Sequence, residues 1–240
     1  MRKKIQNEIE YGAMLANSGA EDIWGWGTPA GKRRAKRRAG LIINGASLKS
    51  SDHVLEIGCG AGMFTELFAR SGAHITAVDV SPDLLEIAKK RNLPKKQVEF
   101  LEAPYEECET EGPFDAIVGS SVLHHLDIEN SLFKIHYMLK KGGYMAFAEP
   151  NFLNPQIFIE RNFRCLFNNV SPDETAFVRF KLRKQLLNIG FAEVSIVPFD
   201  WLHPLVPAKM IDSIDRLGKI WEKIPLVKEF SGSLCIIAVK

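Results

Sequence analysis

The chain has 240 residues, of which 46% are hydrophobic and 25% are charged, and its formal net charge is +2. This length and composition are typical of one well-buried α/β domain with an appendage and argue against two full domains. The four cysteines are scattered and form no C-x-x-C pair, which argues against a zinc site or a disulfide framework. No apolar run reaches the length of a membrane span, so we expect no such span. We also expect no metal centre. The scattered cysteines suit a reducing compartment, so we expect a cytoplasmic location.

The pattern of residues 1–48 predicts a helical cap on the domain. Polar residues at weakly helical spacing indicate a first helix over 1–22. The pattern then breaks at a Trp-Gly-Trp-Gly segment that begins at Trp24. Thr28 is a typical N-cap and is followed by proline, so we expect a second helix over 29–44, with the next glycine as its stop.

The cap is also the most basic part of the chain. Residues 1–49 contain ten Lys and Arg against four Asp and Glu, and six of these basic residues lie in 32–38. A run of this kind usually forms the solvated face of a helix that packs on a core. Two other interpretations stay open, namely a cap that presents cations to an anionic substrate, and contact with RNA.

The rest of the chain is organised around residues 54–62, an apolar run followed by glycines at alternate positions. The run is typical of a buried strand, and the spacing after Met63 predicts a helix. Glycine lets the backbone turn sharply and leaves room for a ligand where a Cβ would stand. The next strand ends at Asp79, where an acid about twenty residues past the first glycine accepts hydrogen bonds from ribose hydroxyls. These features predict the first βαβ unit of a nucleotide-binding domain.

The spacing of the glycines decides between cofactors. Alternate glycines follow from Gly58, and Met63 stands where the dinucleotide pattern G-x-G-x-x-G requires its third glycine. An NAD-dependent oxidoreductase is therefore disfavoured. Glu56 precedes the first glycine by two residues, and a pyrophosphate would not favour a carboxylate there. S-adenosylmethionine carries sulfonium and ammonium charges and no phosphate, so Glu56 and Asp79 favour this cofactor.

Strands and helices alternate through the middle of the chain. We expect further strands at 75–79, 98–101, 114–119 and 144–148, and helices at 82–92, with Ser81 as N-cap, and at 128–140. Strands that alternate with helices of this length predict a doubly wound parallel sheet with right-handed crossovers.

Beyond residue 150 the pattern is looser. We expect a helix from Ser171 to near Gly190, a strand over 191–197 and a last strand over 234–239. An amphipathic stretch at 208–220 lies between these strands. A gap of roughly 35 residues is too long for a structureless loop and predicts a helical insertion.

The motifs together resemble the class I S-adenosylmethionine-dependent methyltransferases that act on small molecules. The signature is Glu56-Ile57-Gly58-Cys59-Gly60-Ala61-Gly62, and the segments 114–118, 123–126 and 139–143 are similar to further family signatures. The resemblance spans about residues 50–150. It implies an α/β fold with a doubly wound, mostly parallel seven-stranded Rossmann-like sheet whose last strand is antiparallel.

The resemblance also implies a domain organisation. One methyltransferase domain would cover 1–240, with the helical cap at 1–48. Residues 49–150 would form the cofactor-binding core. Residues 151–240 would supply the substrate-side helices and the final two strands.

The resemblance implies a cofactor site formed by Glu56, Gly58, Cys59, Gly60, Gly62, Asp79, Val80, Ala103, Pro104 and Ser120. The glycine turn would lie against the methionyl part and the ribose. Asp79 would accept from both ribose hydroxyls, and Val80 would pack on the adenine. Ala103 and Pro104 would border the adenine edge, although many relatives carry an acid in place of Pro104 that receives the adenine amino group. Ser120 would face the methionyl ammonium.

The acceptor site is less constrained than the cofactor site. Relatives often carry a histidine at the position of His125, so we expect His125 to contact the acceptor or to remove its proton. His124 is the second histidine candidate, although either residue would also suit the start of the following helix. Trp26 and Arg33 of the cap are the other expected acceptor-binding residues. Other aromatic, polar and basic candidates are Trp24, Phe152, Asn154, Arg161, Trp201 and His203.

The sequence therefore predicts a methyltransferase that uses S-adenosylmethionine and releases S-adenosylhomocysteine. The methyl group would move by in-line displacement to a small-molecule or carrier-bound acceptor, with alignment as the main contribution of the protein. One alternative is an RNA methyltransferase that uses 32–38, although the Asn/Asp-Pro-Pro-aromatic motif of nucleic-acid amino methyltransferases does not follow the fourth strand. A second alternative is a non-catalytic protein that binds the same cofactor.

Overall fold

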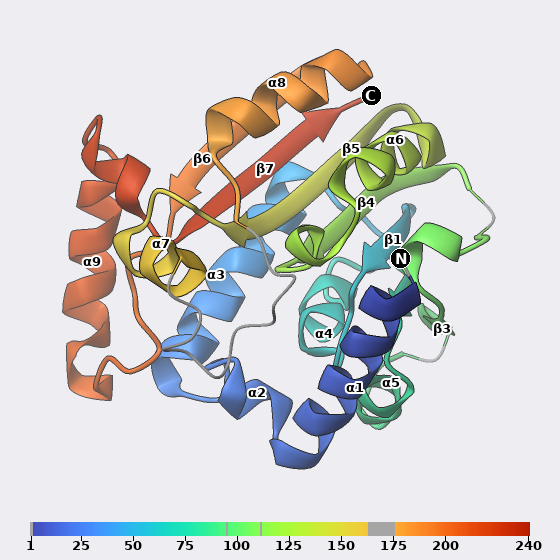
Figure 1. The fold of residues 1–240 in the computed structure, drawn as a ribbon, viewed down its shortest axis with the longest axis horizontal. Coiled ribbons are helices and arrows are strands. Elements are labelled where there is room, and N and C mark those ends of the chain that lie inside the picture. The colour runs from blue at the N-terminus through green and yellow to red at the C-terminus, as the bar shows by residue number, and fades with distance from the viewer. Residues whose placement is uncertain (1, 95, 111, 163–175) are drawn as a thin grey trace.

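The computed structural model describes residues 2–94, 96–110, 112–162 and 176–240. Its centre is a seven-stranded sheet in the order β3-β2-β1-β4-β5-β7-β6 (Figure 1). The strands are β1 (His53–Ile57), β2 (His74–Asp79), β3 (Val98–Glu102), β4 (Phe114–Ser120), β5 (Leu139–Pro150), β6 (Glu193–Phe199) and β7 (Ser233–Val239). Strand β7 is antiparallel to both of its neighbours, and the other pairs are parallel. The predicted fold class is confirmed.

Helices cover both faces of this sheet. They are α1 (Arg2–Ser18), α2 (Ala20–Ile23), α3 (Pro29–Gly45), α4 (Met63–Ala69), α5 (Pro82–Lys89), α6 (Ile128–Met138), α7 (Pro155–Asn162), α8 (Arg179–Ile189) and α9 (Ile211–Trp221). The expected N-caps are confirmed, because the side chains of Thr28 and Ser81 accept hydrogen bonds from the backbone of Gly31 and Leu84. None of the helices described here is long and apolar enough to cross a bilayer.

The core has two halves because successive side chains of a strand point to opposite faces of a sheet. Leu55 of β1 is fully buried on the face that α6 covers, together with Leu132 of that helix. Val54 is buried on the other face, among Ile42 of α3 and Phe68 of α4. The face of a given strand residue therefore decides which helix it contacts.

The amino-terminal cap packs on the sheet and on its helices. Helix α1 contacts α5, and α3 contacts β5 and β7. The last residue of α3, Gly45, has no room for a side chain, since a Cβ built there would lie 2.3 Å from Cδ1 of Ile237. The expectation that this glycine acts as a stop signal outside the helix is wrong, because Gly45 is still helical and Ala46 is the C-cap.

Several element boundaries differ from the sequence prediction; for example, α5 ends at Lys89 and not at residue 92, and β5 is longer than the predicted 144–148. Helix α6 ends at Met138, two residues early, because Leu139 already pairs with Phe114 in the sheet. Helix α8 begins only at Arg179, and its expected start at Ser171 lies outside the described residues. Strand β6 begins later than expected because the backbone N–H of Phe191 still caps α8 by donating to Leu186 O.

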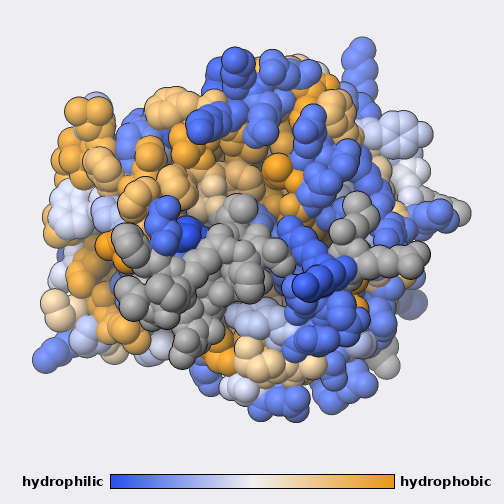
Figure 2. Space-filling model, viewed as in Figure 1, coloured by the Kyte–Doolittle hydropathy of each residue, from blue (hydrophilic) through white to orange (hydrophobic). Residues whose placement is uncertain are grey.

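The predicted helical insertion is confirmed as α9, preceded by η4 (Ala208–Met210) and followed by η5 (Val227–Phe230). Helix α9 buries Ile211 and leaves Leu217 and Ile220 exposed. Figure 2 shows apolar side chains gathered on the left of the view, over α9 and η5. The insertion therefore covers the end of the sheet that carries β6 and β7 and leaves part of its own apolar surface uncovered (Figure 1).

Candidate functional site

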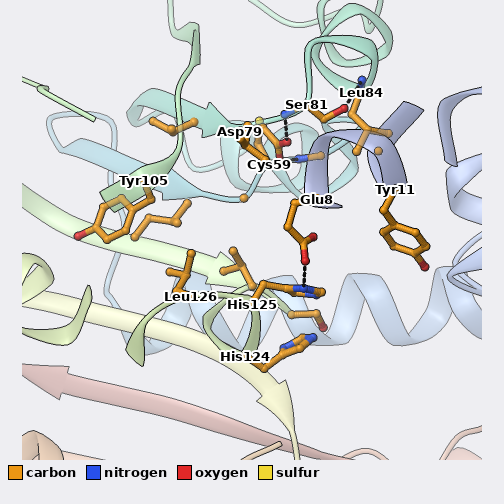
Figure 3. Close-up of a pocket in the computed structure, with 18 of the residues that line it drawn as sticks. Glu8, Tyr11, Cys59, Asp79, Ser81, Leu84, Tyr105, His124, His125 and Leu126 are labelled. Atoms are coloured by element: carbon orange, nitrogen blue, oxygen red, sulfur yellow. Dashed lines mark hydrogen bonds and ion pairs between the residues drawn. The ribbon is translucent and has the colours of Figure 1, made fainter. Parts of the chain in front are cut away.

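A cavity of about 580 Å³ opens where β1, β2 and β4 end, at the carboxyl edge of the sheet. Parallel sheets bind ligands at this edge. The cap closes the opposite side with Lys4, Ile5, Glu8, Tyr11, Gly12, Leu15, Trp24 and Trp26. Figure 3 shows Glu8 of α1 between Asp79 above and the two histidines below, with Tyr11 of α1 to one side. The cavity thus lies between a sheet edge and a segment from the far end of the chain.

The floor of the cavity is the glycine turn after β1. Gly58, Gly60 and Gly62 have φ angles of 67°, 50° and 77°, in the left-handed region that glycine adopts without steric cost. A Cβ at Gly58 would also lie 2.3 Å from Cγ2 of Val122. The turn is fixed by its own backbone, because the N–H groups of Gly58 and Cys59 both donate to Val78 O. The sequence argument for glycine at these positions is therefore confirmed.

Asp79 lies beside this turn at the end of β2. Its Oδ2 accepts from the Gly60 N–H at 2.7 Å, and its Oδ1 accepts from the Ser81 N–H at 2.9 Å. Burial raises the pKa of Asp79, and these two hydrogen bonds oppose the rise. Each carboxylate oxygen has a further lone pair. The cavity therefore offers an oriented acid next to an open backbone turn, which suits the two hydroxyls of a ribose.

Comparisons with known proteins agree with this geometry. Residues 55–147 match the family model described as "Methyltransferase domain". Over these residues the chain is similar to that family. The resemblance to class I S-adenosylmethionine-dependent methyltransferases is confirmed, and the matched segment contains the glycine turn, Asp79 and the histidine pair.

Two curated relatives are both named "Ubiquinone biosynthesis O-methyltransferase". The protein from Xylella fastidiosa (strain M23) is 34% identical over 136 residues, which are 53% of this chain and 55% of the relative. The protein from Xanthomonas axonopodis pv. citri (strain 306) is 30% identical over 151 residues, 61% of this chain and 62% of the relative. The chain thus spans about half of the length of the curated relatives it matches.

Solved structures agree with the fold of the methyltransferase domain over more of the chain. The N-methyltransferase NodS from Bradyrhizobium japonicum WM9, in complex with S-adenosyl-L-homocysteine, has a TM-score of 0.63 and 19% identity, covering 97% of this chain and 96% of its own. A SAM-dependent methyltransferase from Archaeoglobus fulgidus has a TM-score of 0.61 and 22% identity, covering 87% and 94%. At these low sequence identities, the similarity to both structures shows that the fold is shared.

Most of the expected cofactor residues of the methyltransferase domain meet at the cavity. The lining includes Gly58, Cys59, Gly60, Asp79, Val80, Ala103, Pro104 and Ser120. Gly62 lies outside the lining; it is the N-cap of α4 and packs against Ala88. Glu56 also lies outside the lining. It is 1% exposed, and burial raises its pKa to about 8. A direct contact of Glu56 with a ligand in this cavity therefore has no support in the geometry.

Arg38 joins the cap to this edge of the sheet. It is 3% exposed, and its Nη1 donates to Oγ of Ser121 at 2.7 Å and to Oγ of Ser120 at 3.3 Å. Burial lowers the pKa of Arg38 to about 10, so the guanidinium is charged at neutral pH. Ser121 has a φ of 58°, an uncommon backbone conformation for serine. Sequence reasoning missed Arg38 because it was one of six basic residues in a run.

Arg33 does not reach the cavity. Its guanidinium donates to the carboxylates of Asp212 and Asp215, and Asp215 is 5% exposed in its side chain. The prediction that Arg33 binds the acceptor is thus not supported by its position. Trp26 lines the cavity, where its ring lies edge-on to Phe64 and Arg38 lies over its face.

The other acceptor candidates divide between cavity and surroundings. Trp24 and Arg161 line the cavity, and the Trp24 ring lies so close to the glycine turn that a Cβ at Gly60 would be 3.2 Å from it. Phe152, Asn154, Trp201 and His203 lie outside the lining. Asn154, for example, donates to Phe230 O and so joins two segments of the chain. In the part of the chain that the structure describes, no group of three or more His, Cys, Asp or Glu is placed to hold a metal ion.

Both histidines of the methyltransferase domain line the cavity, and each meets a carboxylate. Nδ1 of His124 lies 2.7 Å from Oε2 of Glu149, and Nδ1 of His125 lies 3.1 Å from Oε1 of Glu8. The two rings are neighbours, with centroids 4.2 Å apart. Sequence reasoning assigned no role to Glu149, although its place at the end of β5 was a signal. Nothing in the sequence indicated Glu8, because its contact depends on how α1 packs.

Proposed function

We propose that this chain is an S-adenosylmethionine-dependent methyltransferase that acts on a hydroxyl of a small-molecule or carrier-bound acceptor. The observation that carries the proposal is the glycine turn with Asp79 on the floor of a closed-over cavity. When bound, S-adenosylmethionine supplies a methyl group on a positively charged sulfur and leaves as S-adenosylhomocysteine.

The residues at the floor of the cavity fit this cofactor. The turn at Gly58 has no space for a Cβ, and Asp79 keeps lone pairs for a ribose. Among the residues that the structure describes, the acids that line the cavity are Glu8, Asp79, Glu106 and Asp127, and the basic residues are Lys4 and Arg161. This acidic balance favours a ligand with net positive charge.

Two details of the expected binding mode are refined. Pro104 and Ala103 are proposed to border the adenine, and Glu106, two residues further on, lines the same cavity and supplies the acid that Pro104 cannot. Ser120 was expected to face an ammonium group. Because Arg38 donates to its hydroxyl from behind, Ser120 is now proposed to face the carboxylate of the methionyl group instead.

The acceptor is proposed to be apolar and to react through oxygen. Ile5, Leu15, Trp24, Trp26 and Phe64 give the cavity an apolar wall, on which a ring or chain buries its surface. The two curated relatives described above are named as O-methyltransferases, which supports a hydroxyl as the reacting group. The cap at 1–48 is proposed to hold the acceptor in line and to exclude water, the contribution that orientation makes in such displacements.

RNA is disfavoured as the acceptor because the arginines of α3 are used inside the molecule. Arg33 and Arg34 pair with Asp215 and Asp200, and the Arg37 guanidinium pairs with Glu222. Arg38 is buried against the serines. Among the residues that the structure describes, Lys32 and Lys36 of the run form no ion pair, so few cations remain for phosphates.

Calorimetric titration with S-adenosylmethionine tests this proposal. The wild-type protein is expected to bind, and Asp79→Ala is expected to weaken binding by about 10- to 100-fold, as one or two charge-assisted hydrogen bonds are lost. Asp115→Ala is the matched control, because Asp115 also accepts a backbone hydrogen bond, from His53, but lies outside the cavity. Equal affinity of wild type and Asp79→Ala would overturn the ribose assignment.

The non-catalytic alternative needs a second measurement. A pool of hydroxylated aromatic compounds and methyl-labelled S-adenosylmethionine are incubated with the protein. A methyltransferase releases S-adenosylhomocysteine together with a labelled acceptor, whereas a non-catalytic binding protein gives heat of binding and neither product.

A further inference from the structure

The two carboxylate–histidine pairs at the cavity are built differently. Glu149 is 0% exposed and His124 is 5% exposed, and both belong to the sheet edge. The side chains of Glu8 and His125 are 19% and 20% exposed, and Glu8 comes from α1 of the cap. Figure 3 shows the two histidines side by side on one wall, with Glu8 reaching His125 from the opposite side. Only the first pair therefore lies wholly at the sheet edge, with Glu149 in β5 and His124 in the short turn that follows β4.

Glu149 is held in place by several donors. Its Oε1 accepts from the N–H of Val122 at 2.9 Å and from the N–H of Leu123 at 3.0 Å, while Oε2 meets His124. Burial opposes ionisation of Glu149, but the hydrogen bonds from His124 and from these two amides outweigh it and lower its pKa. Glu149 is therefore an anion that accepts three hydrogen bonds.

The charge of Glu149 decides the tautomer of its neighbour. A carboxylate only accepts hydrogen bonds, so Nδ1 of His124 must carry the proton that bridges to Oε2. In a neutral imidazole the lone pair is then on Nε2. The same carboxylate stabilises the imidazolium that forms when Nε2 takes a proton. This is the arrangement in which a buried acid orients a histidine base.

We propose that His124 is the base that removes the proton of the acceptor, and that Glu149 is the residue that positions it. The proposal rests on the proposed function and moves the proton-removal role from His125 to His124. His125 is left in contact with the acceptor. The shorter hydrogen bond and the complete burial of Glu149 favour His124, because a fixed partner holds one ring orientation and one tautomer.

Methyl transfer to the acceptor oxygen and proton transfer to His124 occur in the same step. The hydroxyl oxygen of the acceptor forms a bond to the methyl carbon while its proton moves to Nε2 of His124. The bond from that carbon to sulfur breaks, and its electron pair stays on sulfur as the thioether of S-adenosylhomocysteine. The imidazolium, held by Glu149, then returns its proton to water.

Nitrogen-15 NMR of the histidine rings tests the positioning without any acceptor. Signals of His124 are assigned by their loss in His124→Asn. In the wild-type protein at neutral pH we expect Nδ1 to be protonated and Nε2 to be unprotonated, and in Glu149→Gln we expect this preference to be lost. Glu229→Gln is the matched control, because it removes a part-buried carboxylate that pairs with Arg179 away from the cavity. A wild-type His124 protonated on Nε2 would overturn the proposal, even if Glu149→Gln fails to fold.

Kinetics with catechol as the acceptor probe gives the second readout. Glu149→Gln and His124→Asn are expected to lower kcat by about 10²- to 10⁴-fold with a nearly unchanged KM for S-adenosylmethionine. Glu229→Gln is expected to keep the wild-type kcat. Wild-type kcat in His124→Asn contradicts a base at this position. Calorimetry distinguishes failure of the proposed function from failure of the His124 proposal. If the wild-type protein does not bind S-adenosylmethionine, the proposed function is wrong. The NMR experiment tests the tautomer of His124 independently of cofactor binding.

Discussion

The two sides of the cavity are built in different ways. The floor consists of residues at the ends of strands, such as residues 58–60 directly after β1 and Asp79 at the end of β2, so each residue is placed by its own strand. The cover consists of α1 and the residues around Trp24 and Trp26, which reach the site only because α1 packs on α5 and α3 packs on the sheet. Floor residues tolerate little change in backbone, whereas cover residues act through side-chain contacts. Substitutions on the two sides should therefore have effects of different size and kind.

The largest effect is expected at Gly58 on the floor. Gly58→Ala adds a Cβ at a φ of 67° and places it 2.3 Å from Val122, so the turn must open. We expect a loss of about 2–5 kcal/mol in the free energy of unfolding, from strain and overpacking together, and weaker binding of S-adenosylmethionine. Chemical denaturation and calorimetry measure the two effects.

Gly142→Ala is the control for this comparison. Gly142 has a φ of 78°, but a Cβ there meets no atom within 4 Å. This variant is expected to lose only about 1–2 kcal/mol, the backbone part of the cost, with unchanged cofactor affinity. Equal losses in both variants would mean that crowding at the turn is unimportant.

An intermediate effect is expected from Glu56 beneath the floor, and it depends on pH. Burial raises the pKa of Glu56 from its ordinary 4.5 to about 8. Between these two values the folded protein keeps a proton that the unfolded chain has released, so stability falls as pH rises. Glu56→Gln carries no such proton. It should match wild type near pH 5 and exceed it by about 3 kcal/mol near pH 8 in urea denaturation. Parallel pH curves would mean that Glu56 is not held in the protonated form.

The smallest effect is expected from Glu8 in the cover. Glu8→Gln keeps the shape of the side chain but removes the charge that meets His125 across the cavity. We expect a loss of only about 0.5–1.5 kcal/mol in stability, because both groups are partly exposed. The tautomer of His124, followed by NMR, should not change. A shift of that signal would show that the two histidine pairs are coupled and that the floor is not independent of the cover.

Part of the site was predictable from local sequence. The glycine turn, Asp79, the N-caps Thr28 and Ser81, and the antiparallel final strand implied by the resemblance all agree with the structure. These features depend on backbone geometry or on the end of a single strand, which a few adjacent residues encode. Element boundaries were less predictable, as Leu139 shows, because pairing with a neighbouring strand overrides the helical pattern.

Other features were decided by the tertiary structure alone. The basic run of α3 predicts a cationic surface. In the structure, however, Arg33, Arg34 and Arg37 each pair with an acid more than 160 positions later in the chain. Glu8 meets His125 for the same kind of reason, since α1 is placed over the cavity by its packing. Hydrogen bonds between distant segments leave no periodic signal, because each partner alone looks like an ordinary polar residue. The sequence thus determined the floor of the cavity, and the packing of distant segments determined its cover.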